Sequence, residues 1–177
     1  MKILNELRAR GQVNDLAALL EHIPYARFLG LQVHQLGDEV ITELPPQEHL
    51  TGNPNLPAVH GGVVGAMLEL TAILQLLHDT DCERLPKTVD VSFNYLRPVR
   101  SDTTTFGRAI VTRQGRRVAN VRCELWQHER DRVVANGHGH FVLAPLTTGA
   151  GTDAGQAAPH QATPLMYPED PHHAPRP

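Results

Sequence analysis

The sequence is poor in the residues that several common enzyme classes use as nucleophiles. It contains two serines, Ser92 and Ser101, and no Gly-x-Ser-x-Gly motif, so nothing indicates a serine-hydrolase triad. Its two cysteines, Cys82 and Cys123, form neither a Cys-x-x-Cys pair nor a disulfide framework. Cysteines of this kind are typical of reducing compartments, so we expect a cytoplasmic protein.

The chain has no excess of positive charge, and aromatic side chains are scarce. The formal net charge is −3, and aromatic residues make up 5% of the chain. Nucleic acids need basic surfaces or stacking rings, and anionic membranes need basic surfaces, so we expect neither as a partner. The first twenty residues contain no long apolar run before a small-residue cleavage site, which argues against a signal peptide.

Apolar residues are plentiful, and their pattern predicts one α+β domain. We expect a short helix over residues 14–22 with Asn14 as its N-cap, and two strand arms around the turn Gly37-Asp38. A long helix over residues 62–77 and a meander of about four strands follow, which favours an antiparallel sheet. We assign residues 1–23 to an N-terminal helical segment, 24–145 to the domain and 146–177 to a disordered Pro-rich tail.

The first strand after the long helix alternates clearly between apolar and polar residues. The alternation places one set of side chains on one face of the strand and a second set on the other. The apolar set is Val89, Val91, Phe93 and Tyr95, and the polar set is Asp90, Ser92 and Asn94.

The most apolar stretch, residues 56–79, contains a single acidic residue before its last position, Glu69. A charge near the centre of a membrane span costs about 2.5–3.5 kcal/mol, and the stretch is barely long enough to cross, so we expect a core helix instead. Its apolar residues cover most of the helix circumference, which is typical of a helix enclosed by protein. Glu69 is then either a hydrogen-bonded structural residue or a catalytic carboxylate.

The helix opens with His60, Gly61 and Gly62. This could be an ordinary tight turn, or it could present free N–H groups and the positive helix end to an oxygen that becomes negative. His60 and Glu69 are nine positions apart, which is about 13 Å along a helix and about half a turn around it. If the two ends act together, they do so between two chains of a symmetric dimer.

Two linked motifs resemble a known family. His60-Gly61-Gly62 is followed after six residues by Glu69, and a later strand starts Val89-Asp90 and ends Tyr95-x-x-Pro98. This pattern is similar to that of the PaaI-like acyl-CoA thioesterases of the hotdog-fold superfamily, over roughly residues 24–144. The resemblance implies a long central helix wrapped by a curved antiparallel sheet, in a homodimer that often doubles into a homotetramer. It implies no metal and no cofactor.

The resemblance also implies roles for particular residues in hydrolysis of an acyl-CoA. The Gly61 N–H, helped by Gly62, would polarise the thioester carbonyl, and Glu69 of the neighbouring subunit would act as general base or as nucleophile. His60 would shape the turn, and Thr88 would help to hold the water. The expected substrate-binding residues are Gly62, Asn53, Asn55, Tyr95, Arg97 and Pro98.

The chain departs from the family pattern at two of these positions. Many relatives carry Asp where this chain has Glu69, and some carry Asn where it has Pro54, between Asn53 and Asn55. Arg97 and Arg100 suit the phosphates of CoA, although solvated charges at a strand end explain them equally well.

Other functions stay open at this point. His138 and His140 share a strand face and could hold zinc, but no third ligand is evident. The alternatives to a thioesterase are a non-catalytic acyl-CoA-binding module of the same fold, a dehydratase acting on 3-hydroxyacyl thioesters, and a purely structural oligomer.

Overall fold

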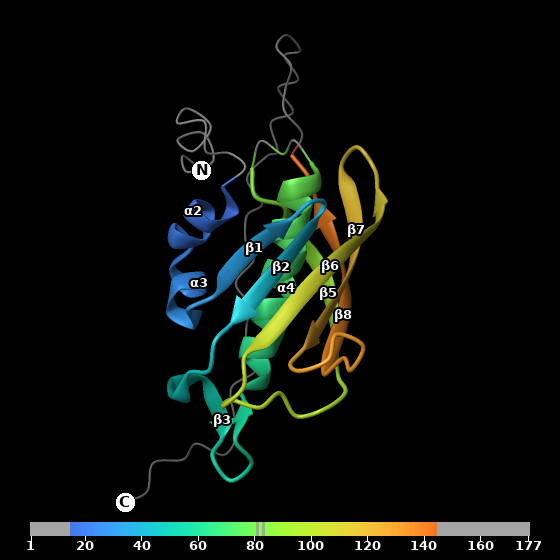
Figure 1. Ribbon diagram of the computed structural model, residues 1–177. Helices are drawn as coiled ribbons and strands as arrows, with labels where there is room; N and C mark the ends of the chain where they lie inside the picture. The colour runs from blue at the N-terminus through green and yellow to red at the C-terminus, as the bar shows by residue number, and fades with distance from the viewer. Residues whose placement is uncertain (1–14, 81, 83, 145–177) are drawn as a thin grey trace, which may run out of the picture. The chain divides into compact units, whose positions relative to one another are not determined.

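The computed structural model describes residues 15–80, 82 and 84–144, and Figure 1 shows the order of their elements. The expected tail over residues 146–177 and most of the expected N-terminal segment lie outside the described residues. Those parts of the domain assignment therefore stay predictions.

Two short helices open the described chain. α2 spans Leu16–Glu21, and its N-cap is Asp15 instead of Asn14, because Asp15 Oδ1 accepts a hydrogen bond from Ala18 N at 2.9 Å. α3 spans Pro24–Leu29 and begins at a proline, which loses nothing there because the first N–H groups of a helix have no internal partner. Both helices bury leucines in the same core as the rest of the described chain.

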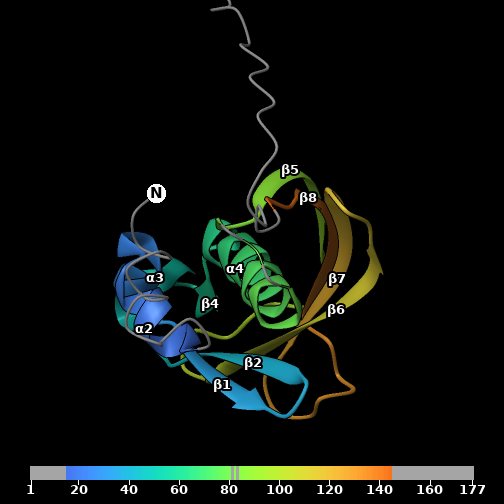
Figure 2. The ribbon, with the colours of Figure 1, turned by 90° about the horizontal axis from the view of Figure 1, so that it is seen from above.

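Six antiparallel strands form one sheet that curves around a long helix, α4, as Figure 2 shows. The strands lie in the order β1-β2-β6-β7-β8-β5. Their bounds are Gln32–Leu36 for β1, Glu39–Leu44 for β2, Lys87–Tyr95 for β5, Thr105–Gln114 for β6, Val118–Trp126 for β7 and Ala135–Val142 for β8. This is the α+β hotdog architecture that the resemblance predicted: a central helix wrapped by a curved antiparallel sheet.

A small hairpin precedes α4. The 3-10 turn η1 (Glu48–Leu50) leads into β3 (Thr51–Asn53), which pairs with β4 (Ala58–Val59). His60 N donates to Leu50 O at 2.8 Å, and Val59 N donates to Val99 O at 2.8 Å. These bonds tie the start of α4 both to η1 and to the chain that follows β5.

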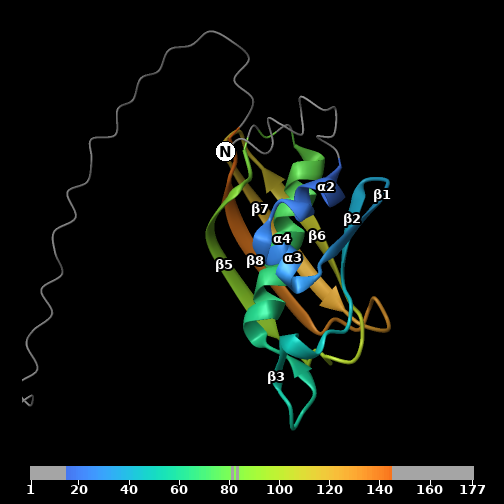
Figure 3. The ribbon, with the colours of Figure 1, turned by 90° about the vertical axis from the view of Figure 1, so that its left-hand side faces the viewer.

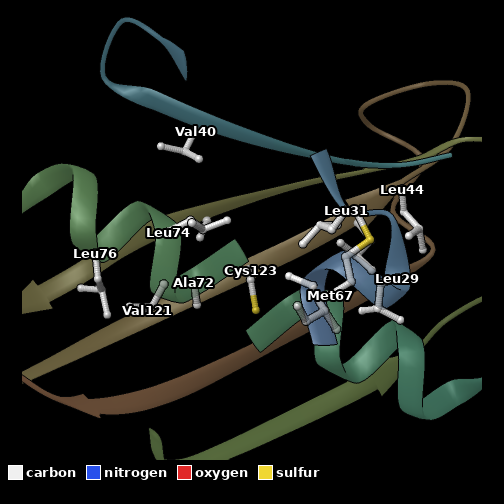
Figure 4. Packing of buried hydrophobic residues seen from close by; sticks show 14 of the residues in the cluster. Leu29, Leu31, Val40, Leu44, Met67, Ala72, Leu74, Leu76, Val121 and Cys123 are labelled. Carbon is white, nitrogen blue, oxygen red and sulfur yellow. The ribbon is translucent and has the colours of Figure 1, made fainter. Parts of the chain in front are cut away.

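The central helix α4 spans Gly61–Asp79, slightly beyond both predicted ends. Figure 4 shows how its buried side chains, among them Met67, Leu74 and Leu76, meet side chains from the sheet and from α3. By length and composition α4 could cross a membrane, but 56% of that stretch is buried inside the protein. Its place between the sheet and α2–α3 is that of a core helix, as predicted.

The strands after α4 do not form the simple meander that we expected. β6, β7 and β8 follow one another, but β5 pairs with β8 and not with β6. The chain between Tyr95 and Thr105 is too long for a tight hairpin, so the two strands need not be neighbours. Figure 3 shows β5 at one border of the sheet, where its outer edge pairs with no strand of the described chain.

The predicted alternation of β5 is correct for Val91, Asp90 and the residues after them, but wrong for Val89. Thr88 pairs with Phe141 and Asp90 pairs with the preceding residue of β8, His140, so Val89 is an extra residue in a β-bulge. Val89 is 63% exposed and does not share the helix-facing side with Val91. The bulge shifts the alternation by one, and so turns Thr88 toward α4.

Candidate functional site

The N-terminus of α4 has one occupied donor and one free donor. His60 is the N-cap, and its Nδ1 accepts a hydrogen bond from Gly62 N at 3.0 Å. An accepting Nδ1 carries no proton, so the neutral ring has its proton on Nε2. No described residue accepts a hydrogen bond from Gly61 N, and this N–H lies at the positive end of the helix dipole.

The fold itself does not require glycine at position 61. Gly61 does not have a positive φ, and a Cβ atom there would meet Tyr95 at an ordinary 3.8 Å. Gly65 is different, because a Cβ atom there would lie 3.0 Å from the Phe93 ring, and so this glycine lets α4 approach β5. Gly61 is exposed, and so there is room beside its N–H for an atom of a ligand or of a second chain.

A pocket of about 290 Å³ lies beside Gly61. It brings together four of the residues singled out in the sequence, namely Gly61, Tyr95, Arg97 and Pro98. The Tyr95 hydroxyl donates to Gly61 O at 3.0 Å, which links the end of β5 to the start of α4. The pocket therefore joins the two motifs that carry the resemblance.

Glu69 lies farther along α4 and has a different environment. It is partly buried, and its Oε1 accepts a hydrogen bond of 2.5 Å from the Thr88 hydroxyl. This is the one hydrogen bond that Glu69 makes with the described residues. The bulge at Val89 is what directs Thr88 to this carboxylate, because without it Thr88 would point to the opposite face of the sheet, with Asp90.

The structure keeps the free donor and the carboxylate apart within one chain. Gly61 and Glu69 are eight residues apart on a continuous helix, which is about 12 Å along its axis. Thr88 sits beside Glu69 and Tyr95 sits beside Gly61, so each end of β5 accompanies one of the two groups. The catalytic roles of these residues stay predictions.

Asn53 and Asn55 lie at the tip of the β3–β4 hairpin, and both are exposed. Asn53 Oδ1 accepts hydrogen bonds from Asn55 N at 3.0 Å and from Leu56 N at 3.4 Å, so it shapes the turn. Neither asparagine side chain forms a hydrogen bond with Glu69 of its own chain, whose one partner among the described residues is Thr88. Their assignment to substrate binding stays a prediction.

A second pocket, of about 420 Å³, adjoins the first and is rich in basic residues. It shares Arg97 and Pro98 with the Gly61 pocket and adds Arg100, His128 and Arg132. Arg100 makes a two-pronged hydrogen-bonded ion pair with Asp102, which lowers the pKa of that carboxyl group to about 2. Sequence reasoning missed His128 and Arg132, which belong to the β7–β8 connection and show no motif.

The contacts of Cys123 and of the pair His138 and His140 do not favour a catalytic cysteine or a zinc site. Burial raises the pKa of the Cys123 thiol to about 12, so this cysteine is a poor nucleophile at neutral pH. His140 Nδ1 lies 2.8 Å from Asp90 Oδ2 on the outer face of the sheet, and His138 is on the same face. Across the described ranges, no group of three or more His, Cys, Asp or Glu side chains is arranged to hold a metal ion.

Comparison with known proteins gives a family and several relatives. A model of the thioesterase superfamily matches residues 56–134, which include α4 and strands β5 to β7. The medium/long-chain acyl-CoA thioesterase YigI of Escherichia coli (strain K12) is 30% identical over 123 residues, covering 62% of this chain and 79% of that protein. The protein of the same description from Salmonella typhimurium is 31% identical over 127 residues, covering 63% and 79%.

Solved structures agree with this assignment. A Chromobacterium violaceum protein superimposes with a TM-score of 0.64 at 34% identity, covering 82% of this chain and 99% of that one. The phenylacetic acid degradation protein PaaI of Thermus thermophilus has a TM-score of 0.58 at 21% identity, covering 68% and 98%, and is similar in fold alone. The chain therefore belongs to the thioesterase superfamily and has its hotdog fold.

Proposed function

We propose that this protein is an acyl-CoA thioesterase, which hydrolyses an acyl-CoA to the free acid and CoA. The observation that carries the proposal is the pair of groups on α4 with unused hydrogen-bonding capacity among the described residues, the Gly61 N–H and the second carboxylate oxygen of Glu69. The relatives named as medium/long-chain acyl-CoA thioesterases support an acyl group of that length.

The chemistry follows from what each group can do. The thioester carbonyl oxygen would accept a hydrogen bond from Gly61 N, where the helix dipole stabilises the negative charge that develops on it. Glu69 would either take a proton from the attacking water or attack the carbonyl carbon itself to give an anhydride that water then opens. In both routes the carbon–sulfur bond breaks, and the CoA thiolate leaves and gains a proton.

The free edge of β5 offers a way to unite the two groups across a dimer. β5 runs antiparallel to α4, with Tyr95 beside Gly61 and Thr88 beside Glu69. If two β5 edges pair around a two-fold axis near Ser92, Tyr95 of one chain lies opposite the Thr88–Val89 bulge of the other. Glu69 of each chain then approaches Gly61 of its twin, and two identical sites form.

One face of α4 supports the same arrangement. Its members share a helical spacing of three or four residues and are all partly buried rather than fully covered by the chain's own sheet. They are Ala66, Glu69, Leu70, Ile73 and Leu77. An apolar stripe around the carboxylate is suited to packing against a second α4, which would also shield the carboxylate from water.

Co-expression of two inactive variants tests the shared site. Glu69→Ala removes the carboxylate, and Gly61→Pro removes the N–H at a helix position where proline is well tolerated. His60, with φ −57° and ψ 133°, already has the extended backbone that a following proline favours. Random pairing makes half of the dimers mixed, and each mixed dimer has one complete site, so about a quarter of the wild-type thiol-release rate should return.

The controls separate the parts of this proposal. Gly61→Ala keeps the N–H and should retain far more activity than Gly61→Pro, since the added Cβ atom meets Tyr95 at 3.8 Å only. Each inactive variant expressed alone gives the baseline. Absence of recovery in a sample shown to contain mixed dimers would rule out a site shared between chains. Absence of thiol release by the wild-type protein from any short, long or aromatic acyl-CoA would rule out the thioesterase itself.

A further inference from the structure

We propose that Gly52 is a positioning residue for the proposed reaction, because it sets the place of His60 and thereby the direction of the Gly61 N–H. Gly52 lies in β3, outside both of the motifs that carry the resemblance. The inference rests on the proposed function, since it says how the proposed carbonyl site is arranged. Figure 1 shows β3 next to the start of α4, whose N-cap is His60.

Glycine at position 52 is required by a contact and not by the backbone conformation. Gly52 does not have a positive φ. A Cβ atom added there would lie 2.6 Å from His60 Cα, 2.9 Å from His60 Cβ and 3.1 Å from His60 Cδ2. Non-bonded carbon atoms are at their best separation at about 3.5–4.0 Å, so a larger residue would force either His60 or β3 to move.

The β3–β4 hairpin has little freedom to move away from His60. The register of β3 with β4 shifts at Gly52, which is the extra residue of a β-bulge. Leu50, directly before β3, is 3% exposed, and its O accepts from His60 N at 2.8 Å. On the other strand, Val59 N donates to Val99 O at 2.8 Å. Because the hairpin is held at both strands, an added Cβ atom would displace His60.

His60 is closely enclosed on its other side as well. A Cβ atom at Gly62 would lie 3.1 Å from His60 Nδ1 and 3.3 Å from His60 Cε1. Nδ1 and Cδ2 are on opposite edges of the imidazole, so the ring lies between two glycines, Gly52 and Gly62. Nδ1 also accepts the hydrogen bond from Gly62 N, at 3.0 Å. The ring therefore has little room for any other position.

The position of His60 decides the direction of the Gly61 N–H. This N–H belongs to the peptide unit that joins His60 to Gly61, and a peptide unit is planar. Its direction therefore follows from the place of His60 Cα and from the ψ of His60, which is 133°. A misplacement of about 1 Å in a reacting site can lower the rate about 100-fold. An added Cβ atom at Gly52 would press on the same Cα atom.

Gly52→Ala tests the proposal in thiol-release kinetics. We expect kcat on an acyl-CoA to fall about 10- to 100-fold with KM nearly unchanged, because the Gly61 N–H acts on charge that develops during the reaction. Gly37→Ala is the matched control, since its φ of 64° strains an alanine but nothing lies within 4 Å of the added Cβ atom. It should lower the midpoint of thermal unfolding and leave kcat, measured well below that midpoint, unchanged.

Nuclear magnetic resonance follows the His60 ring without catalysis. The ¹⁵N signals of this ring are assigned by their loss in His60→Asn, which keeps a capping side chain. They should shift in Gly52→Ala and stay in place in Gly37→Ala. Gly62→Ala presses on the other edge of the ring at a helical position that favours alanine, so it should fold, shift the same signals and lower kcat.

The outcomes separate this proposal from the proposed function. A wild-type kcat in Gly52→Ala, or a lowered kcat with unshifted His60 signals, would overturn the positioning role and leave the thioesterase standing. If Gly52→Ala does not fold, an unchanged kcat in Gly62→Ala would overturn it. If the wild-type protein releases no thiol, the thioesterase is wrong, and shifted His60 signals in Gly52→Ala would still support Gly52 as the residue that places His60.

Discussion

Glu69 and Gln75 are two polar residues on the same apolar helix, less than two turns apart, and they differ in burial and in hydrogen bonding. Gln75 is 3% exposed, and all of its hydrogen bonds end within its own chain. Its Oε1 accepts from Val40 N at 2.9 Å, and its Nε2 donates to Asp38 O at 3.0 Å and to Asp79 Oδ1 at 2.9 Å. Glu69 accepts one hydrogen bond, from Thr88, and is only partly buried.

The difference is the one expected between a structural polar residue and a residue that we propose to be catalytic. Gln75 replaces the hydrogen bonds that the β1–β2 turn would otherwise make with water. Both the oxygen and the nitrogen of its amide are therefore engaged within the protein. The neighbouring Thr71 is similar, because its hydroxyl lies 2.6 Å from Thr42 Oγ1 and donates to Met67 O. The second carboxylate oxygen of Glu69 accepts no hydrogen bond from the described residues.

The largest expected effect is on the rate, from Glu69→Gln. The substitution keeps size and shape but removes the negative charge, so kcat on acyl-CoAs should fall about 10²- to 10⁴-fold with the midpoint of thermal unfolding nearly unchanged. Thiol-release kinetics measure the rate, and a thermal melt by circular dichroism measures the fold. Glu21→Gln changes an exposed glutamate on α2 and should be silent in both assays. An unchanged kcat would remove Glu69 from the chemistry.

A smaller effect on the rate is expected from Thr88→Val, which is nearly isosteric. It removes the hydroxyl that positions Glu69, and a hydrogen bond to a charged group contributes about 1.5–3 kcal/mol, so kcat should fall tenfold or more with little change in KM. Thr112→Val removes an exposed hydroxyl bonded to Asn120 O and serves as the control. Equal rates for the two variants would mean that the bulge at Val89 has no part in arranging the carboxylate.

The smallest effect on the rate, and the clearest effect on stability, is expected from Gln75→Leu. Loss of the amide leaves the buried Val40 N–H without a partner, which should lower the free energy of unfolding by about 1–3 kcal/mol. The unfolding midpoint would fall by about 2–4 °C for each kcal/mol, while kcat measured well below it stays unchanged. Gln32→Leu, on the exposed side of β1, is the control. A loss of activity without a loss of stability would contradict the distinction drawn between Gln75 and Glu69.

Much of the fold and part of the candidate site could be predicted from local patterns. The apolar run of α4, its opening glycines and Glu69 are contiguous in sequence, and Tyr95, Arg97 and Pro98 lie together at the end of β5. The Asp15 cap was missed because neighbouring Asn and Asp are equally good N-caps, and only the hydrogen bond to Ala18 N distinguishes them. The bulge at Val89 was missed because it depends on the register with β8, which leaves no mark on the alternation.

Periodicity and the two linked motifs were sufficient for α2, the buried helix α4, the six strands of the main sheet and the identity of the residues around the start of α4, because these follow from the nearest ten or so residues. They did not predict α3 or the β3–β4 hairpin. The arrangement of distant segments was not contained in any such window. The pairing of β5 with β8, the turning of Thr88 toward Glu69 and the approach of Arg132 to Arg97 arise when strands meet in three dimensions. Each depends on hydrogen bonds and packing between parts of the chain that are far apart in sequence.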